Sequence, residues 1–351
     1  MQANTAFFLS RLADMMAVAL ETEAFMLRIL KYLAIAVLTP LAAFAQSCGT
    51  TDLIAELDAK DRARLDALVA PHVFPVGNLW RAEQDGKTVI VAGTLHIPDA
   101  RLAPMVASIR PHLEGADILI LEATSEDEAA LAGLAASKPD FFFITKGPTL
   151  IDLLGPDDWS RVEERLAALG VPGFLGAKFQ PWYMNLTLAI PPCALALIKS
   201  GKKGFDRQLE DIALESGVTL ASLDDAEAVL SLFADEPIED QLDGLRITLN
   251  TQEDGSANTS TLVEAYFDGR TREGWEFARI LIDNAGIENG AELFEEINQT
   301  LLIGRNQNWE PKIVGLVAGK NAVVAVGAAH LSGESGVLRA LERAGYSVSP
   351  F

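Results

Sequence analysis

The chain has 351 residues, enough for one large domain or two modest ones, and with 49% hydrophobic and 22% charged residues it can bury a sizeable core. Its formal net charge is −21, and so acidic a surface repels phosphate backbones, which argues against nucleic acid as a partner. Nothing in this composition is typical of a disordered or fibrous protein.

Residues 1–45 have the pattern of an export signal. A short basic region precedes an apolar run from Tyr32 to Phe44, and the run ends in a small-x-small cleavage pattern. We therefore expect the natural start at Met26, a mature chain from Gln46 onward, and export to the periplasm. The alternative is an uncleaved signal that anchors the protein in the membrane, facing the periplasm.

The two cysteines are Cys48, just after the predicted cleavage site, and Cys193. In an oxidising compartment such a pair favours one disulfide, which would fasten the mature N-terminus to the folded body. Neither cysteine has the spacing of a zinc site.

The predicted elements begin with an amphipathic helix over 51–70, where leucines recur at helical spacing. Two strands over 78–81 and 87–92 follow, separated by a turn at Asp85-Gly86. The second strand is a continuous apolar run, as expected for a strand buried on both faces.

A helix over 101–113 and a strand over 117–121 come next, so that Glu122 stands at a strand end. The region of about 126–300 is mainly helical in pattern, with a short strand over 218–223 and a polar loop over 251–260. Its expected helices cover 160–169, 192–197, 205–216 and 238–249.

The C-terminal part repeats the opening pattern. A helix over 309–316, with Pro311 in its first turn, precedes an apolar strand over 322–326, and a helix over 336–344 and a strand over 346–349 follow. We therefore predict an α/β fold whose central sheet is mixed or mostly parallel. Two strand–Gly-x-x-His–helix units build it, within a single domain over 46–351 that carries a helical insertion at about 126–300.

Two histidines occupy equivalent places in these units. His96 and His330 each stand three residues after a glycine, Gly93 or Gly327, that closes a buried strand. Parallel strands bring their carboxyl ends to one edge of the sheet, so Glu122 is expected beside them. Lone histidines at strand ends are mostly structural, but two in one setting with a carboxylate favour a shared site.

Two histidines and a carboxylate suit a divalent metal ion that keeps an open position for water. Such an ion makes a hydroxide nucleophile near neutral pH. Glu122 would be either the third ligand or the general base, and the residue pattern leaves both roles open. The other histidines, His72 and His112, follow prolines and are expected at the surface without a catalytic role.

These motifs resemble the TraB/GumN family, which is related to the Tiki metallopeptidases. The resemblance covers roughly residues 48–351 and is carried by both Gly-x-x-His segments, Glu122, Arg305-Asn306 and weaker matches at Gln180-Pro-Trp182, Gly204-Phe-Asp206 and Leu223-Asp-Asp225. It implies an α/β core with a metal-dependent peptidase site, in which His96, His330 and Glu122 hold the ion.

The resemblance also assigns roles to three polar residues. Arg305 would hold a substrate carboxylate or an oxyanion, and its alternative role is a salt bridge. Asp206 would orient a histidine or Arg305, although it is also an ordinary acid at a helix start, and Asn306 would support the site from outside.

The first functional hypothesis is an exported metal-dependent hydrolase that acts as a peptidase on a peptide or protein. The second is a non-catalytic envelope protein that binds a metal, haem or peptide. A third is a metal-free, esterase-like enzyme that uses histidine and glutamate as acid and base; no Gly-x-Ser-x-Gly motif is present for a serine version.

Overall fold

A six-stranded sheet forms the centre of the structure. The computed structural model describes residues 48–251, 255–286 and 289–351, so the predicted export signal lies outside the described residues. The strands lie in the order β4-β3-β5-β2-β1-β6. They are β1 (Leu79–Gln84), β2 (Lys87–Thr94), β3 (Ile118–Leu121), β4 (Thr219–Ser222), β5 (Ala322–Gly327) and β6 (Ser347–Pro350).

The four strands from β4 to β2 are parallel, whereas β1 pairs antiparallel with both β2 and β6. This confirms the predicted mostly parallel sheet. The β1–β2 hairpin turns at Asp85 and Gly86, whose φ angles of 51° and 76° suit the two-residue turn that matches strand twist. The antiparallel pairs lie at one side of the sheet, so the carboxyl ends of the four parallel strands are adjacent to one another.

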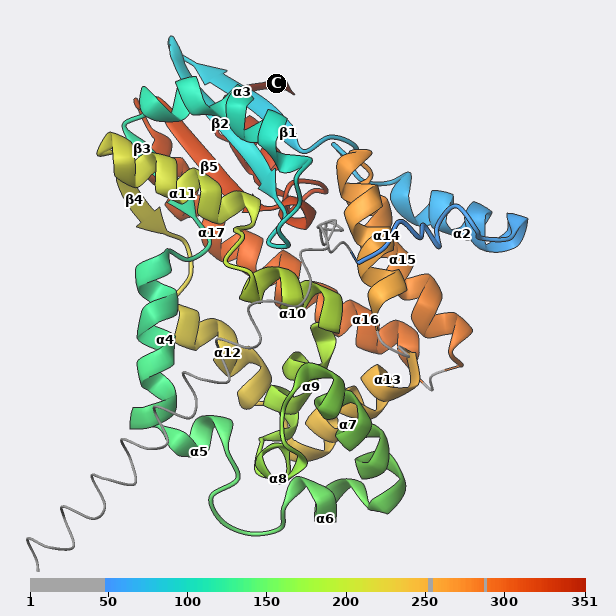
Figure 1. Cartoon of the computed structure of the whole chain (residues 1–351). Helices are drawn as coiled ribbons and strands as arrows, with labels where there is room; N and C mark the ends of the chain where they lie inside the picture. The colour runs from blue at the N-terminus through green and yellow to red at the C-terminus, as the bar shows by residue number, and fades with distance from the viewer. Residues whose placement is uncertain (1–47, 252–254, 287–288) are drawn as a thin grey trace, which may run out of the picture. The chain divides into compact units, whose positions relative to one another are not determined.

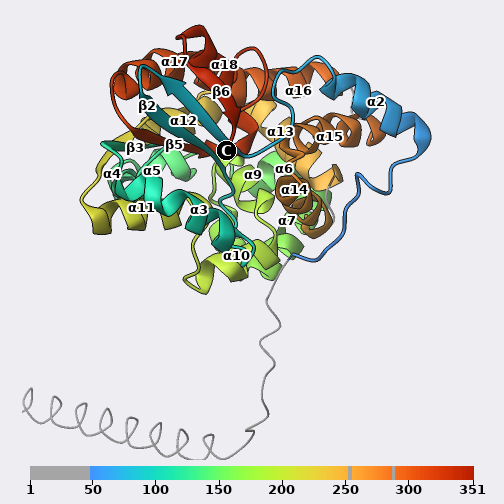
Figure 2. The same ribbon diagram turned by 90° about the horizontal axis from the view of Figure 1, so that it is seen from above.

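Helices cover both faces of the sheet, and Figure 2 shows the sheet between these two layers. On one face, α3 (Leu102–Glu114) and α11 (Phe205–Ser216) pack on one alternate set of strand side chains, including Ile90 and Leu119. On the other, α17 (Gly304–Val317) and α18 (Val337–Arg343) pack on the opposite set, including Val91 and Ile120. Alternating strand side chains therefore reach two separate cores.

The remaining helices form two further clusters, and Figure 1 shows most of the middle region below the sheet. Helices α6, α7, α9 and α13 share a core of their own, and α2, α14 and α15 share a smaller one. Their bounds are α2 (Ala59–Val69), α4 (Ser125–Ser137), α5 (Pro139–Phe142), α6 (Leu150–Leu154), α7 (Pro156–Leu169), α8 (Gly173–Gly176), α9 (Pro181–Ala189), α10 (Pro192–Lys199), α12 (Ala226–Ala234), α13 (Ile238–Thr251), α14 (Ser256–Phe267), α15 (Thr271–Asn284) and α16 (Gly290–Asn298). A π-helix, η1 (Gln299–Ile303), joins α16 to α17, and a 3₁₀ turn, η2 (Ala328–His330), follows β5.

The predicted bounds of several elements were wrong; the helix expected over 160–169 begins at Pro156, and the strand expected over 78–81 extends to Gln84. The helix expected over 51–70 begins only at Ala59, because the Asp58 carboxylate caps its first amides. The loop expected over 251–260 is shorter, since α14 begins at Ser256, although residues 252–254 lie outside the described part. The helix expected from Trp309 begins at Gly304, which places Pro311 inside it rather than in its first turn.

Cys48 and Cys193 form a disulfide, with Cα atoms 5.1 Å apart, which fastens the start of the described chain to α10. In the described part of the chain no single helix is long and apolar enough to cross a membrane. Helices α9 and α10 satisfy that test only together, and they are bent by 81° at the break between them.

Candidate functional site

Four strand ends bring polar side chains to one edge of the sheet. In the parallel register Leu121 lies opposite both Ala325 and Ser222, and Thr94 lies opposite Gly327. The segments that continue from these strands therefore leave the sheet side by side. They carry His96 after β2, Glu122 after β3, Asp224 after β4 and His330 after β5.

Glu122 is held in its ionised form at the centre of this edge. Its Oε1 accepts a hydrogen bond of 2.6 Å from the Gly327 amide, and its Oε2 accepts one from Arg305 Nη2. Burial raises the pKa of this carboxyl. The opposing effect of its surroundings is larger and brings the pKa down to about 2, and it comes from His330, Arg305, His96 and the Gly327 amide. Glu122 is therefore a fixed negative charge at neutral pH.

Arg305, from the start of α17, is surrounded by acceptors. Its Nε and Nη2 donate to Asp224 Oδ2 at 3.0 and 2.7 Å, and Nη2 also donates to Glu122. Its Nη1 donates to the Leu301 carbonyl at 3.4 Å and lies 3.2 Å from His330 Nε2. Burial lowers the pKa of Arg305, but the two carboxylates outweigh that effect and raise it. The five N–H groups of the guanidinium thus all have partners.

Trp309 fixes this arrangement from one turn further along α17. Its indole Nε1 donates to Asp224 Oδ1 at 2.6 Å, and the Arg305 guanidinium lies over its ring, 4.6 Å from the centroid. The indole is fully buried, so it holds Asp224 and Arg305 without a contribution from solvent.

His330 is buried and turns its Nε2 atom toward Arg305 in the cluster. Its Nδ1 lies 2.8 Å from Asn306 Oδ1, while Asn306 Nδ2 donates to the His330 carbonyl at 3.2 Å. Because the amide oxygen can only accept, we assign the proton to Nδ1, which leaves Nε2 unprotonated and facing Arg305. Burial lowers the pKa of His330 to about 4, so the ring is neutral at pH 7.

His96 differs from the rest of the cluster because its side chain is 64% exposed. Its Nδ1 lies 3.2 Å from Oδ1 of Asp206, in the first turn of α11. That carboxylate raises the pKa of His96 to about 9. The exposed imidazole is therefore protonated at neutral pH and is oriented by Asp206.

The start of α11 is tied directly to the His96 segment. The Phe205 amide donates to the Leu95 carbonyl at 2.9 Å, and the Gly204 backbone lies against the His96 backbone. A side-chain carbon at Gly204 would lie 2.3 Å from the His96 carbonyl oxygen, so only glycine allows this approach. This contact sets the distance between Asp206 and His96.

Replacing Asp206 with asparagine is expected to lower the pKa of His96 toward its ordinary value near 6.5. A raised histidine pKa contributes stability that is complete below the unfolded pKa and is lost as pH rises toward about 9. In the variant, the free energy of unfolding should therefore no longer fall through the titration of His96 as pH rises from about 6.5 to about 9. Proton NMR titration of the four histidines in chelator-treated protein measures the shift.

The matched control is Asp211→Asn, which removes a carboxylate from the same helix that pairs with Lys203 instead of His96. An unchanged His96 titration in Asp206→Asn, or an equal shift in the control, would contradict the assignment of Asp206 as the orienting group.

Gly327 lies where the three motif side chains meet. A side-chain carbon there would come within 3.0 Å of Glu122 Oε1, 3.6 Å of His330 Cδ2 and 4.0 Å of His96 Nε2. Both imidazoles have their Nδ1 atoms engaged by other residues, as is usual for histidines that bind a metal through Nε2. The donor types and their supporting partners thus match the set predicted for a divalent ion.

As placed, however, these donors do not form a metal site. Among the described residues, no three His, Cys, Asp or Glu side chains are close enough to hold one ion. The Arg305 guanidinium already lies against Glu122 and His330 Nε2, which are 3.9 Å apart. An ion shared by these two residues would require Arg305 to move.

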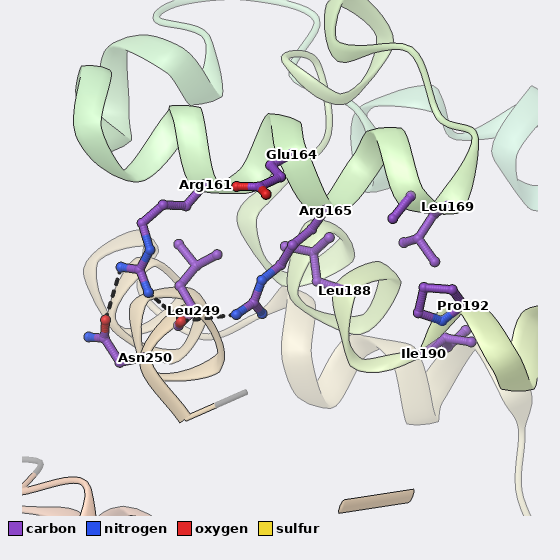
Figure 3. A pocket seen from close by; sticks show the side chains of 10 residues that line it. Arg161, Glu164, Arg165, Leu169, Leu188, Ile190, Pro192, Leu249 and Asn250 are labelled. Atoms are coloured by element: carbon purple, nitrogen blue, oxygen red, sulfur yellow. Dashed lines mark hydrogen bonds between the residues drawn. The ribbon is translucent and has the colours of Figure 1, made fainter. Parts of the chain in front are cut away.

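A pocket of about 270 Å³ opens beside this cluster and is lined by His96, Glu122, Asp206, Asp224 and Arg305. A larger pocket, of about 630 Å³, lies between α7, α10 and the end of α13 (Figure 3). There Arg161 and Arg165 donate to the last carbonyls of α13, so they cap a helix. The smaller pocket is the candidate site, because it contains His96 and Glu122, whose pKa values are strongly shifted.

Every residue predicted for the site from the sequence lies at this edge. The structure brings together His96, Glu122, Arg305, His330 and the four supporting residues Gly93, Gly327, Asp206 and Asn306. Gly93 packs against the turn after β5, where a side-chain carbon would lie 2.8 Å from Leu331 Cδ1. His72 and His112 pack elsewhere, against Arg272 and Phe351.

Two residues of the site were missed. Asp224 was noted only as part of a weak family match, and Trp309 only as the start of a helix. The strand-end rule that selected Glu122 would also have selected Asp224, because it follows β4 by two residues. No local signal marks Trp309, whose role depends on how α17 packs on the sheet.

The sheet and its edge cluster define an α/β protein with a strand-end site built from two Gly-x-x-His motifs. Residues 78–350 match the model of the TraB/PrgY/gumN family, which is more than two thirds of the chain. The chain therefore belongs to the TraB/PrgY/gumN family. No curated protein matches it significantly.

Proposed function

We propose that this chain is a hydrolase that cuts amide bonds in peptides or proteins at the edge formed by β2, β5, β3 and β4. The observation that supports this best is the contrast between His96 and its neighbours. His96 is exposed and protonated, whereas Glu122, Arg305 and His330 are locked by hydrogen bonds. One mobile proton beside a fixed carboxylate is what acid–base hydrolysis requires.

In this proposal the substrate carbonyl lies in the pocket between His96 and Glu122. Water oxygen bonds to the carbonyl carbon, and the carbon–nitrogen bond breaks with its electron pair left on nitrogen. The amine takes a proton from His96 Nε2, and the proton released by the water returns the imidazole to its charged form. Asp206 holds the ring in position, and Glu122 accepts a hydrogen bond from the attacking water.

A divalent ion, when bound, would be held by His96, Glu122 and His330 and would supply an activated water. His96 would then have to be neutral, and Arg305 would have to leave His330 Nε2. Hydrolysis by His96 and Glu122 can therefore be tested separately from binding of the ion.

We also propose that the protein is exported to the periplasm, either free or held by an uncleaved signal anchor. The N-terminal sequence pattern supports export. The disulfide between Cys48 and Cys193 supports it as well, since such bonds persist mainly in oxidising compartments.

The test uses the full chain, purified without chelator or nickel affinity, with elemental analysis and digestion of a peptide library followed by mass spectrometry. Replacing His96 with alanine is expected to lower the cleavage rate by about 100-fold or more, as for loss of a general acid. The control is His112→Ala, which removes a histidine that stacks on Phe351 outside the cluster.

The outcomes distinguish a metal-dependent hydrolase, a metal-free hydrolase and a binding protein. Cleavage that chelation abolishes, with metal lost from both His96→Ala and His330→Ala, supports the metal-dependent enzyme. Cleavage that resists chelation but needs His96 supports acid–base hydrolysis without an ion. A wild-type protein that retains a ligand through purification and cuts nothing would overturn the proposal in favour of a binding protein.

A further inference from the structure

The pocket beside His96 has walls of two kinds. One wall carries the charged cluster described above. The other is apolar and comes from two helices, α4 and α12, which contribute Leu131, Val229 and Leu230. Its volume of about 270 Å³ is slightly below the range of roughly 300–1,000 Å³ that is usual for ligand pockets, so it suits one part of a larger molecule.

Thr94, the last residue of β2, lines this pocket and is only 4% exposed. Its hydroxyl oxygen is fully buried and has no hydrogen-bond partner within the described ranges. A buried hydroxyl without a partner destabilises the folded protein, so such groups are rare unless a ligand satisfies them. Thr94 therefore offers an unused hydrogen-bond donor and acceptor in the pocket lining to a molecule that reaches it.

Helix α12 is unusual for a different reason. Its sequence is AEAVLSLFA, yet none of its residues is buried. Val229 and Leu230 on this helix line the pocket and are only half-covered, whereas Leu232 and Phe233 line a separate pocket against α13. Apolar side chains left uncovered beside a reactive cluster favour an apolar group of the substrate as their partner.

The two arginines of the pocket are not available to a carboxylate on the substrate. Arg305 is fully engaged, as described above. Arg207 pairs with Glu128 at 2.7 Å and with Glu210, and it also donates to the Ala123 carbonyl at 3.0 Å. The third cation of the lining, His96, is paired with Asp206. Carboxylates outnumber cations in the lining by four to three, which disfavours a negatively charged group in the pocket.

We propose that this pocket binds a peptide segment with an apolar residue next to the bond that is cut. The apolar side chain packs on Leu131, Val229 and Leu230, and the adjoining peptide group forms a hydrogen bond with the Thr94 hydroxyl. The inference rests on the proposed function and names its substrate class: peptides with an uncharged, apolar residue at the cleavage site.

The first test compares Thr94→Val, which removes the hydroxyl, with Thr94→Ser, which keeps it. The probe is the blocked dipeptide acetyl-Ala-Leu-amide, with binding followed by NMR and thermal unfolding measured in parallel. Thr94→Val should bind about 10-fold more weakly, the loss expected for one hydrogen bond, whereas Thr94→Ser should stay within about 3-fold. The melting temperature of Thr94→Val should not fall, since the hydroxyl has no partner among the residues that the structure describes.

A lower melting temperature in Thr94→Val with unchanged binding would show that the hydroxyl is structural and would overturn the assignment. The second comparison is acetyl-Ala-Asp-amide, which the wild type should bind at least about 10-fold more weakly than the leucine peptide. Replacing Leu230 with asparagine should reduce this preference. Equal binding of the two peptides by the wild type would also overturn the inference.

The peptide library distinguishes this inference from the proposed function. Cleavage at sites without an excess of apolar residues would leave hydrolysis standing and overturn the substrate class. Selective binding of the leucine peptide without any cleavage would support the proposed peptide-binding pocket and would overturn the proposed hydrolase activity.

Discussion

Replacing Arg305 with alanine is expected to lower the free energy of unfolding by about 3–5 kcal/mol, the usual cost of breaking a buried ion pair from one side. The loss leaves Glu122 and Asp224, whose side chains are 17% and 13% exposed, as neighbouring carboxylates without their shared cation. It also removes the N–H group facing His330 Nε2. Urea unfolding followed by circular dichroism measures the change.

The matched control is Arg343→Ala, which breaks the ion pair between Arg343 and Glu310 at the surface, where the side chains are 41% and 34% exposed. Screening by solvent limits that loss to about 0–1 kcal/mol. If Arg305→Ala cost no more than this control, Arg305 would not be the group that balances the two carboxylates. Arg305→Lys should recover only part of the loss, because an ammonium cannot reproduce the guanidinium geometry.

Replacing Gly204 with alanine should damage both stability and activity. The φ angle at Gly204 is −64°, which any residue adopts, so the substitution tests space alone. The new carbon would lie 2.3 Å from the carbonyl oxygen of His96 and 2.6 Å from its carbonyl carbon, and backbone atoms cannot rotate away. We expect a loss of about 1–3 kcal/mol, as for overpacking, and a fall in cleavage rate of about 100-fold as His96 moves away from Asp206.

Gly315 provides the control for this prediction. It lies exposed in α17, and a side-chain carbon there would have nothing within 4 Å. Gly315→Ala should therefore stabilise the protein by about 0.5–1 kcal/mol through helix propensity, with unchanged cleavage. Normal cleavage and stability in Gly204→Ala would show that the His96 segment tolerates displacement, and the positional role given to α11 would be wrong.

The core of the sheet and the meeting of its strand ends were predictable from the sequence. The runs Val89–Ala92 and Ala322–Val326 are uninterrupted and apolar, as strands buried on both faces must be, and each ends at a glycine. Once such strands are parallel, simple geometry places His96, Glu122 and His330 at one edge.

The helix boundaries were less predictable because they depend on packing and on capping. The leucines of 51–58 have helical spacing, but they cover the core of α15 without forming a helix. The π-turn η1 carries α16 directly into α17, so no new start signal marks Gly304. The spacing of apolar residues therefore does not show where one helix continues directly into the next.

The surroundings of Arg305 were beyond prediction for a related reason. Its partners come from four separate segments, around Glu122, Asp224, Leu301 and His330. Which of them the guanidinium reaches depends on how α17 seats Trp309, Ile313 and Val317 against the sheet. That long-range packing decides between a salt bridge and a free substrate-binding cation, and the structure contains the salt bridge.

The central place of β5 has a consequence for the synthesis of the protein. β5 lies between β3 and β2, although it is made more than 200 residues after them. Until residues 322–327 have left the ribosome and docked, no strand joins β2, which leads to His96, to β3, which leads to Glu122. A growing chain therefore cannot assemble this site before its last strands exist, so any activity the site confers is withheld until synthesis is almost complete.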